Sequence, residues 1–366
     1  VCAAKTNGEI YCWGKNEAVE SDPSVPTSQF GTDISHPTLV GSWTYGSVET
    51  FAAGAAHTCA GNSNGTYCWG DDGQGQLGDG SPNGNASGPM PVSVGGQTND
   101  FAFVMMDAHQ DFTCGVASSG VIYCWGYTGL GPQRMAVDYD SPEKTLTVST
   151  GGNNPPLEFE TVAVGGEHLC GAARSNEVWC MGDNSEGQCG GSDCPLHNQV
   201  SAPIGGGGYF EDVFVGHEHS CALANTDDIY CWGDDRFDQL GGGNSDPYSG
   251  TSPIDSDADA TDGAKLAAGY RHNCAIDSTG TMYCWGRDYY GQVGDGLPRD
   301  SAIASPTEPT GNHSFKDVAA GDGFTCGIID NPGDANVYCW GFANHEQLGV
   351  GNSNSSDSPM NVKCRE

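Results

Sequence analysis

Short apolar segments that end in glycine recur along the chain and alternate with polar, glycine-rich stretches. The most regular segment reads Tyr-Cys-Trp-Gly, or a close variant, and it occurs seven times. Its glycines lie 56, 56, 56, 51, 53 and 55 residues apart, at Gly14, Gly70, Gly126, Gly182, Gly233, Gly286 and Gly341. Self-similarity at such a period indicates a repeat architecture such as a solenoid or a propeller.

Each repeat predicts four short strands. The first is apolar and ends in glycine, as in Phe159-Glu-Thr-Val-Ala-Val-Gly165, and the second carries a cysteine, as in His219-Ser-Cys-Ala-Leu223. The third is the aromatic, β-favouring Tyr-Cys-Trp-Gly, and the fourth contains proline, which is typical of an edge strand. A four-stranded antiparallel unit repeated seven times is a propeller-blade pattern. We therefore expect an all-β, seven-bladed β-propeller that forms one domain over residues 1–366.

The first repeat starts one strand late. The chain begins at Val1-Cys2, on the second strand of the repeat, and no segment like Phe315-Lys-Asp-Val-Ala-Ala-Gly321 precedes it or follows Val362. We expect the first blade to lack its innermost strand within these residues. Either residues upstream of Val1 supply that strand, or a partner donates it by β-augmentation.

The 17 cysteines follow the repeat. Because the second and third strands form a hairpin, the two cysteines of a repeat lie opposite each other, within reach of a disulfide. Zinc sites instead favour closely spaced cysteine couples or a local mixture with histidine. We predict one disulfide per blade, with the pairs Cys2/Cys12, Cys59/Cys68, Cys114/Cys124, Cys170/Cys180, Cys221/Cys231, Cys274/Cys284 and Cys326/Cys339.

Three cysteines lie outside this scheme. Cys189 and Cys194 follow the fourth Cys-x-Gly segment and are predicted to pair with each other. Cys364 is left over, which predicts a bond to another chain or to residues beyond this sequence, with a free thiol as the alternative. A framework of this density indicates oxidising surroundings, so we expect a secreted, extracellular or cell-surface protein.

Composition narrows the classes of partner. The formal charge is −34, from 47 acidic and 13 basic residues, and such a surface repels nucleic acid and anionic lipid head groups. It attracts cations and basic protein patches instead. The sequence has no apolar run long enough to span a bilayer. We therefore expect a protein partner or self-association, no nucleic acid and no membrane insertion.

Two kinds of loop suggest surface chemistry. Carboxylates gather at Asp71, Asp72 and Asp79 and at Asp255, Asp257 and Asp259, and Ca²⁺ prefers six to eight oxygens on such turns. Solvated turns are the alternative interpretation, and we expect no other cofactor. Four Asn-x-Ser/Thr triplets permit N-glycosylation where the producing cell performs it, at Asn64, Asn85, Asn312 and Asn354.

The histidines favour a structural role. His57, His168, His219 and His272 recur at one position of the repeat, which predicts participation in the repeat's own hydrogen bonding. His217-Glu-His219 is a weak hint of a metal site, without a third ligand. There is no His-Glu-x-x-His motif and no Gly-rich phosphate-binding loop. We therefore expect a protein that is not an enzyme.

The repeat resembles that of a known family. Ala267-Ala-Gly-Tyr-Arg-His272, Met282-Tyr-Cys-Trp-Gly286 and Gly291-Gln-Val-Gly-Asp-Gly296 are similar to the regulator of chromosome condensation repeat. The resemblance covers nearly the whole chain and implies a seven-bladed β-propeller. The paired cysteines resemble those of exported, bacterial-type members. The nucleotide-exchange activity that the nuclear members imply needs a cytosolic or nuclear GTPase, and the predicted disulfides argue against it.

These observations favour a non-enzymatic binding or structural propeller, such as a subunit of a surface or extracellular assembly. Its first candidate contact residues are the loop aromatics Trp43, Tyr45, Phe237, Tyr248, Tyr289 and Tyr290. One alternative is a propeller-type protein inhibitor of a secreted enzyme. Another, from a different class, is a polysaccharide lyase or hydrolase, for which the abundance of carboxylates is the sole support.

Overall fold

The structure, a computed structural model, is built from β-strands. It describes residues 1–5, 7–15, 33–40, 44–81, 85–94, 102–127, 139–146, 157–190, 198–200, 210–225, 228–241, 265–297, 302–329 and 336–362. The chain divides into two compact units at the boundary between Ser175 and Asn176. Within the described residues, no helix has the length and apolarity to cross a membrane.

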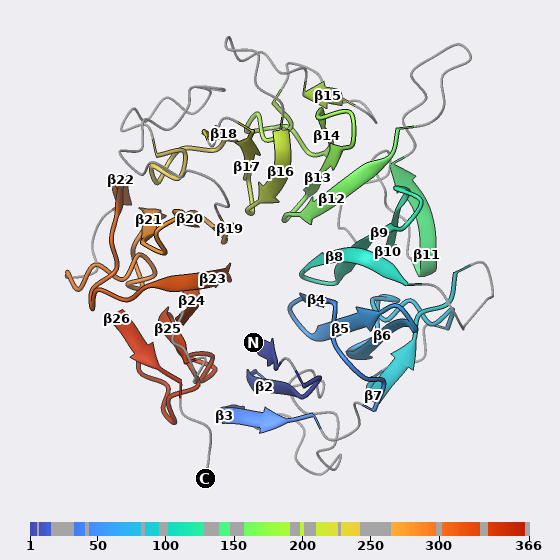
Figure 1. The fold of residues 1–366 in the computed structure, drawn as a ribbon, viewed down its shortest axis with the longest axis horizontal. Helices are drawn as coiled ribbons and strands as arrows, with labels where there is room; N and C mark the ends of the chain where they lie inside the picture. Colours follow the sequence, from blue (N-terminus) through green and yellow to red (C-terminus); the bar gives the residue numbers. More distant parts are fainter. Residues whose placement is uncertain are drawn as a thin grey trace. The chain divides into compact units, whose positions relative to one another are not determined.

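The first unit contains three sheets and the first two strands of a fourth (Figure 1). Its strands are β1 (Cys2–Ala4), β2 (Ile10–Gly14), β3 (Ile34–Leu39), β4 (Thr50–Ala53), β5 (His57–Asn62), β6 (Gly65–Gly70), β7 (Ala86–Pro91), β8 (Phe103–His109), β9 (Phe112–Ala117), β10 (Ile122–Gly126), β11 (Tyr139–Leu146), β12 (Phe159–Val164) and β13 (His168–Ala173). The first sheet has the order β1-β2-β3, with β1 at its edge, and the second and third sheets have four strands each.

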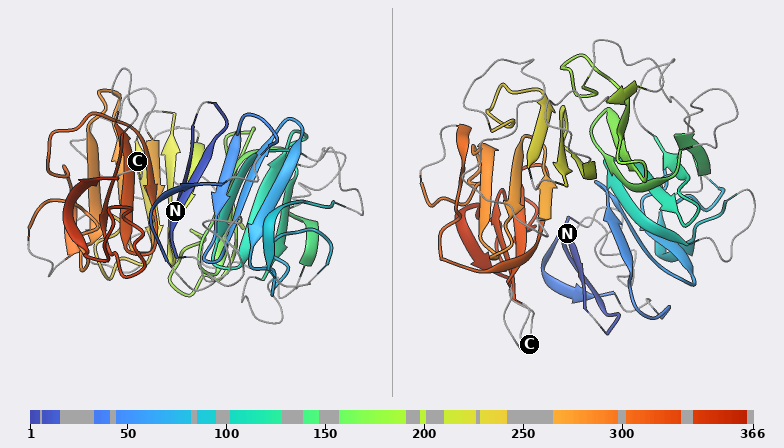
Figure 2. Two further views of the ribbon diagram at one scale, coloured as in Figure 1. Left: turned by 90° about the horizontal axis from the view of Figure 1, so that it is seen from below. Right: turned by 45° about the horizontal axis from the view of Figure 1, so that its top comes forward.

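The second unit contains the remaining strands of the fourth sheet and three further sheets. Its strands are β14 (Val178–Gly182), β15 (Asn198–Val200), β16 (Phe210–Val215), β17 (His219–Ala224), β18 (Ile229–Gly233), β19 (Lys265–Ala268), β20 (His272–Ile276), β21 (Met282–Arg287), β22 (Ala302–Thr307), β23 (Phe315–Ala320), β24 (Phe324–Ile329), β25 (Val337–Gly341) and β26 (Ser356–Asn361). In the last sheet the order is β23-β24-β25-β26, so successive strands of the chain are neighbours; Figure 2 draws this end of the chain in dark orange to red. The prediction of an all-β chain is confirmed.

The repeated cysteines face each other across antiparallel strands, as predicted. Cys59 lies opposite Cys68, and Cys274 lies opposite Cys284, in the same register of the sheet. The Cα atoms of the bonded cysteines are 4.0–4.1 Å apart in the pairs Cys2–Cys12, Cys59–Cys68, Cys114–Cys124, Cys221–Cys231, Cys274–Cys284 and Cys326–Cys339. Cys170 and Cys180 are disulfide-bonded as well.

Tryptophans of the repeat fill the space between successive sheets. Trp69, Trp125, Trp232, Trp285 and Trp340 are at most 1% exposed. Trp285, for example, belongs to a cluster that includes Leu223 of β17 and Leu266 of β19, so it packs two neighbouring sheets together. Its indole Nε1 also donates to the main-chain oxygen of Gln239, 3.0 Å away in the loop of the preceding sheet. The Trp of the motif therefore joins sheets by apolar burial and by a hydrogen bond.

The glycine of the motif lets the chain pass close to a neighbouring turn. Gly286 has φ +98°, and a Cβ atom there would lie 2.7 Å from the carbonyl oxygen of Arg271. Immediately after it, the main-chain nitrogen of Arg287 donates to that same oxygen at 2.8 Å. Only glycine combines this conformation with so close an approach. The residue after the motif is thus fixed beside the turn between the first two strands of its sheet.

Candidate functional site

Three turns of the second unit bring a set of arginine and aromatic side chains together. They are the turn between β19 and β20, the loop after β18 and the loop after β21. The main-chain bond from Arg287 to Arg271 fixes two of these turns side by side. We define the Arg–aromatic face by its residues, which are Phe237, Tyr270, Arg271, Arg287, Tyr289 and Tyr290.

Ion pairs tie one part of this face to the fold. Glu218 accepts from Arg236 at 2.8 Å and from Arg271 at 2.7 Å. Asp234 is fully buried and accepts from Nε of Arg236 at 2.6 Å. Burial alone raises the pKa of Asp234, but hydrogen bonds from Arg236 and Gln239 outweigh it, so the pKa lies below its usual value. Arg236 and Arg271 therefore have their charges paired with carboxylates of the same chain.

Arg287 has a different environment. Its guanidinium carbon lies 5.2 Å from the ring centroid of Phe237, 5.4 Å from that of Tyr289 and 5.6 Å from that of Tyr290. No Asp or Glu side chain among the described residues forms an ion pair with it. Cation–π contacts of this kind hold an arginine by the faces of rings. The face thus presents an arginine that aromatic side chains position without neutralising it.

The aromatic part of the face is continuous and partly open. Tyr289 packs edge-on against Tyr290 with ring centroids 5.0 Å apart, and Tyr290 lies 4.5 Å from Phe342. Tyr289 is 56% exposed, which is high for so large a side chain. Exposed aromatic and arginine side chains are the residue types that anchor protein interfaces.

Three of the predicted contact residues meet at this face, namely Phe237, Tyr289 and Tyr290. Tyr45 lies in the other unit, where its ring stacks on Tyr67 at 3.8 Å. Trp43 and Tyr248 lie outside the described residues. Tyr270, Arg271 and Arg287 were not predicted. A comparison of the repeats would have indicated Arg287, because Asp71, Asp183 and Asp234 occupy its position in other repeats.

The carboxylates of the Gly-Gln-Leu-Gly loops stabilise those loops. Asp72 is buried and accepts from the main-chain nitrogen of Leu77 at 3.0 Å, while Asp71 accepts from the Gln76 side chain at 3.0 Å. Asp79 accepts from the nitrogen of Ser81 at 2.9 Å. The interpretation of Asp72 as part of a solvated turn is wrong, since the turn encloses its side chain. Within the described residues, no three His, Cys, Asp or Glu side chains cluster as metal ligands.

A calcium site stays a prediction for Asp255, Asp257 and Asp259, which lie outside the described residues. The same holds for the predicted bonds of Cys194 and Cys364. Cys189 is buried at the position that Leu77 holds in its own repeat, and its nitrogen donates to Asn184 at 2.8 Å. Four side chains of the predicted glycosylation sites are exposed, those of Asn64, Asn85, Asn312 and Asn354.

The repeated histidines form hydrogen bonds between sheets, as predicted. Nε2 of His272 lies 2.9 Å from Oγ1 of Thr325 in the next sheet, and that hydroxyl donates to the carbonyl oxygen of Gln292. His57 and His219 make the same kind of contact, with Thr113 and Asn273 respectively. His217 and His219 have no third His, Cys, Asp or Glu side chain grouped with them as a metal ligand among the described residues. The hint of a metal site at His217-Glu-His219 is therefore not supported.

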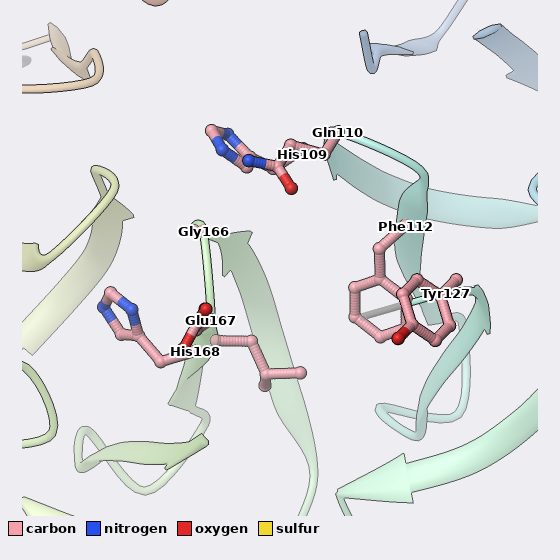
Figure 3. A pocket seen from close by; sticks show the side chains of 9 residues that line it. His109, Gln110, Phe112, Tyr127, Gly166, Glu167 and His168 are labelled. Atoms are coloured by element: carbon pink, nitrogen blue, oxygen red, sulfur yellow. The ribbon is translucent and has the colours of Figure 1, made fainter. Parts of the chain in front are cut away.

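A small pocket lies in the first unit, between the β8–β9 and β12–β13 turns (Figure 3). Phe112 and Tyr127 lie together on one side of it and His168 lies on the other. Its cavity volume is ≈ 10 Å³, about the space that one water molecule occupies. Its lining does not include a group of carboxylates or a nucleophile. We therefore regard the Arg–aromatic face as the stronger candidate site.

The buried carboxyl group of Asp235, in the loop after β18, allows a test of how these loops are stabilised. It is 1% exposed, and burial raises its pKa to about 6 although Leu240 donates a main-chain bond to it. A carboxyl with a raised folded-state pKa costs stability once it ionises, so the cost is present above pH 6 and absent near pH 4. In the loop of the fourth sheet, the uncharged side chain of Asn184 accepts the equivalent main-chain hydrogen bond, from Cys189. The free energy of unfolding of the variant Asp235→Asn should therefore be higher than that of the wild type by on the order of 1–2 kcal/mol at pH 7.5.

Urea unfolding of both proteins at pH 7.5 and pH 4.5 checks this expectation. The gain should be much smaller at pH 4.5, where Asp235 carries a proton in the folded wild type. A variant less stable than the wild type at pH 7.5 would show that the ionised carboxylate is needed by the loop.

The sequence is similar to those of known proteins. The family model of the RCC1-like domain matches residues 9–366. The Ultraviolet-B receptor UVR8 of Arabidopsis thaliana is 28% identical over 326 residues, which cover 86% of this chain and 70% of that protein. The Regulator of chromosome condensation of Xenopus laevis is 24% identical over 327 residues, which cover 84% of this chain and 74% of that protein.

Solved structures agree on the fold. Yeast RCC1 (Prp20) bound to Kap60 matches with a TM-score of 0.81 at 22% identity, over 98% of this chain and 84% of that one. Prp20p from Saccharomyces cerevisiae, studied with its binding to Gsp1p and histones, matches with a TM-score of 0.80 at 22% identity, over 98% and 87% of the two chains. The seven sheets are thus the blades of a seven-bladed β-propeller, with disulfide-bonded cysteines in each, as predicted.

Proposed function

This chain belongs to the family of RCC1-like domains, and we propose that it is a protein-binding propeller whose Arg–aromatic face contacts the partner. The observation that carries the proposal is the exposed Tyr289 beside Arg287, an arginine that no carboxylate of the described residues neutralises. Interface anchors are enriched in tyrosine and arginine and are commonly surrounded by weaker contacts. Prp20, which shares the fold, binds Kap60.

The role is non-enzymatic in this proposal. The carboxylates next to the face, Glu218 and Asp234, are paired with Arg236 and Arg271, so they are committed to ion pairs. General acid–base catalysis requires a carboxyl free to exchange a proton with substrate. A net charge of −34 also opposes the approach of nucleic acid, which favours a protein as the partner.

We place the protein outside the cytosol, secreted or on the cell surface, as a subunit of an assembly there. Six disulfides with both partners described, all within blades, support that location, because cytosolic thiols are kept reduced. In such surroundings a rigid blade displays the loops that carry Arg287 and Tyr289. The partner is then another extracellular protein or a second copy of this chain.

Affinity capture from the culture medium and from surface-labelled cells tests the proposal. The variant Tyr289→Ser should reduce recovery of a stoichiometric partner about 30-fold, the effect of removing an aromatic anchor worth about 2 kcal/mol. Leu297→Ser is the matched control, because Leu297 is 59% exposed in the same blade and makes no ring contact with the face. Equal loss with both variants, or a partner found only in the cytosol, would contradict the proposal.

A further inference from the structure

We propose that Arg287 is a carboxylate-binding anchor, onto which a protein segment docks through an Asp, a Glu or a free C-terminal carboxylate. This inference rests on the proposed function and names the chemistry of the partner. It follows from the place of Arg287 in the repeat, from the way its guanidinium is held and from what its surroundings leave open.

Three of the other six repeats carry an Asp at the position of Arg287, and the remaining three carry Lys15, Tyr127 and Phe342 there. Asp71, Asp183 and Asp234 follow the motif glycine in their repeats, and each accepts from the side-chain amide of the loop glutamine at 2.8–3.0 Å. In the sixth sheet the corresponding Gln292 keeps its other bonds, to the Tyr290 nitrogen and the Trp340 indole. The loop thus forms without a carboxylate there. Nothing in the architecture of the repeat demands a cation at this position.

The guanidinium of Arg287 is held by ring faces. Such contacts are electrostatic, and the hydrogen-bond donors of a guanidinium are the five N–H groups in its plane, at its edge. Arg236 and Arg271 direct their edges to Glu218 and Asp234. Arg287 has no such acceptor among the described Asp and Glu side chains. Its edge is therefore available to an acceptor from outside.

The geometry of the donors selects the acceptor. The planar fork of arginine matches a carboxylate through two parallel N–H···O bonds, and the pair is strongest where water is partly excluded. Arg287 is only partly exposed, and the rings of Phe237, Tyr289 and Tyr290 lie around it. Those rings already turn toward the guanidinium, so they offer a poor platform for stacking a sugar. An acidic side chain followed by an apolar one fits the site, with the apolar group packed on Tyr289.

Charge complementarity supports the same occupant. The chain holds 13 basic residues against 47 acidic ones, and among the described arginines Arg174, Arg236 and Arg271 are paired with carboxylates whereas Arg287 is not. A strongly acidic surface repels a polyanion as a whole, while a single guanidinium attracts one carboxylate at short range. The expected segment therefore carries one or two carboxylates within a largely apolar or neutral sequence. A highly charged acidic tract is disfavoured.

The probe is a random peptide library displayed on phage, selected against the full chain in its oxidised form. We expect the selected peptides to be enriched in Asp, Glu or a free C-terminus next to an apolar residue. Synthetic copies should bind about 10- to 100-fold more weakly to Arg287→Ala, which is the loss expected for a charge-assisted bond. Arg287→Lys keeps the positive charge but lacks the planar pair of N–H donors, so its peptide affinity should lie between those of the wild type and of Arg287→Ala.

Two controls separate binding from folding. Arg287→Asp installs the residue that three other repeats carry at this position, so it should unfold at nearly the same temperature as the wild type while binding fails. Arg174→Ala, in the first unit, removes a half-exposed arginine that pairs with Glu158 and should leave peptide binding unchanged. Peptides in which Gln replaces Glu should bind the wild type as weakly as the original peptides bind Arg287→Ala.

The outcomes distinguish this inference from the proposed function. No preference for carboxylates, or equal binding by Arg287→Ala, overturns the inference. Retention of the wild type on polygalacturonate, with loss in Arg287→Ala and no peptide binding, assigns the anchor to a uronate sugar and also overturns it. If Tyr289→Ser abolishes partner capture while Arg287→Asp does not, the result supports a protein-binding role for the Arg–aromatic face and contradicts the assignment of Arg287 as a carboxylate anchor. If neither variant changes capture, the proposed function falls.

Discussion

Reduction of the disulfides is expected to unfold this protein under otherwise native conditions. Each described bond closes a loop of 9–13 residues along the chain. In the chain-entropy model a loop of this length contributes about 2.7 kcal/mol by restricting the unfolded state. Six such bonds amount to on the order of 16 kcal/mol, whereas a whole domain is stable by about 5–15 kcal/mol. The reduced chain therefore has little or no net stability left.

The amino-acid composition makes the effect larger than in an average domain. Hydrophobic residues form 37% of the chain and glycines number 56, so apolar burial is modest and the entropy cost of ordering the backbone is high. Most of the bonded cysteines, such as Cys59 and Cys284, are fully buried. Reduction will therefore be slow until a blade opens, and it should then proceed without a stable intermediate in that blade.

A single blade gives the cleanest measurement. The double variant Cys274→Ala/Cys284→Ala should lose about 3 kcal/mol in urea unfolding at pH 7 without reductant. Near-ultraviolet circular dichroism of the wild type should collapse after prolonged incubation with excess dithiothreitol. In the presence of the reductant the double variant and the wild type should become equally unstable. A reduced wild type that keeps its near-ultraviolet signal and unfolds cooperatively would refute this account.

The fold was predictable because one repeat contains nearly all the information for one blade. The register that opposes Cys274 to Cys284 follows from a hairpin with a short turn, and the strand bounds follow from Gly286 and its equivalents. The hydrogen-bonding role of His272 was also predicted. Its partner, Thr325, was not, because it belongs to the next repeat and the contact depends on how sheets pack.

The site was less predictable for a physical reason. Phe237, Arg271 and Arg287 come from three separate segments and lie 16–50 residues apart in sequence, so no local pattern predicts that they meet. Their proximity arises from the main-chain bond between Arg287 and Arg271 and from the packing of neighbouring blades. The carboxylates that sequence singled out, such as Asp72, proved to stabilise their own loops. Their number reflects the number of repeats.

Acidification from pH 7 to pH 4.5 is expected to destabilise the oxidised protein strongly, through its buried histidines. Burial lowers the pKa of His57 and of His219 to about 4 and that of His272 to about 3. Nε2 of His272 donates to Thr325, whose hydroxyl is committed to Gln292, so the lone pair lies on Nδ1. That Nδ1 is buried without a hydrogen-bond partner. A second proton there would be a buried charge with no acceptor.

These pKa values fix the sign of the pH dependence. A histidine with a depressed folded-state pKa contributes stability that is fully present above about pH 6.5 and is lost as the pH falls toward 4. Each histidine adds a slope of up to about 1.4 kcal/mol per pH unit, so three add up to about 4. Asp235 acts in the opposite direction, because its pKa is raised to about 6. One group of that kind offsets about one of the three histidines, so the net effect is a loss.

The variant His272→Phe tests the cause, because the seventh sheet carries Phe324 at the equivalent position beside Gly321. Urea unfolding at pH 7, 6, 5 and 4.5 should give a slope lower by about 1.4 kcal/mol per pH unit than in the wild type. The variant loses the bond to Thr325, so it should be less stable at pH 7 and should regain that deficit relative to the wild type at pH 4.5. Substitution of the exposed His345 by Asn should leave the slope unchanged. An unfolding free energy that does not vary between pH 7 and pH 5 would mean that these rings accept protons in the folded state, and that water or a carboxylate reaches Nδ1.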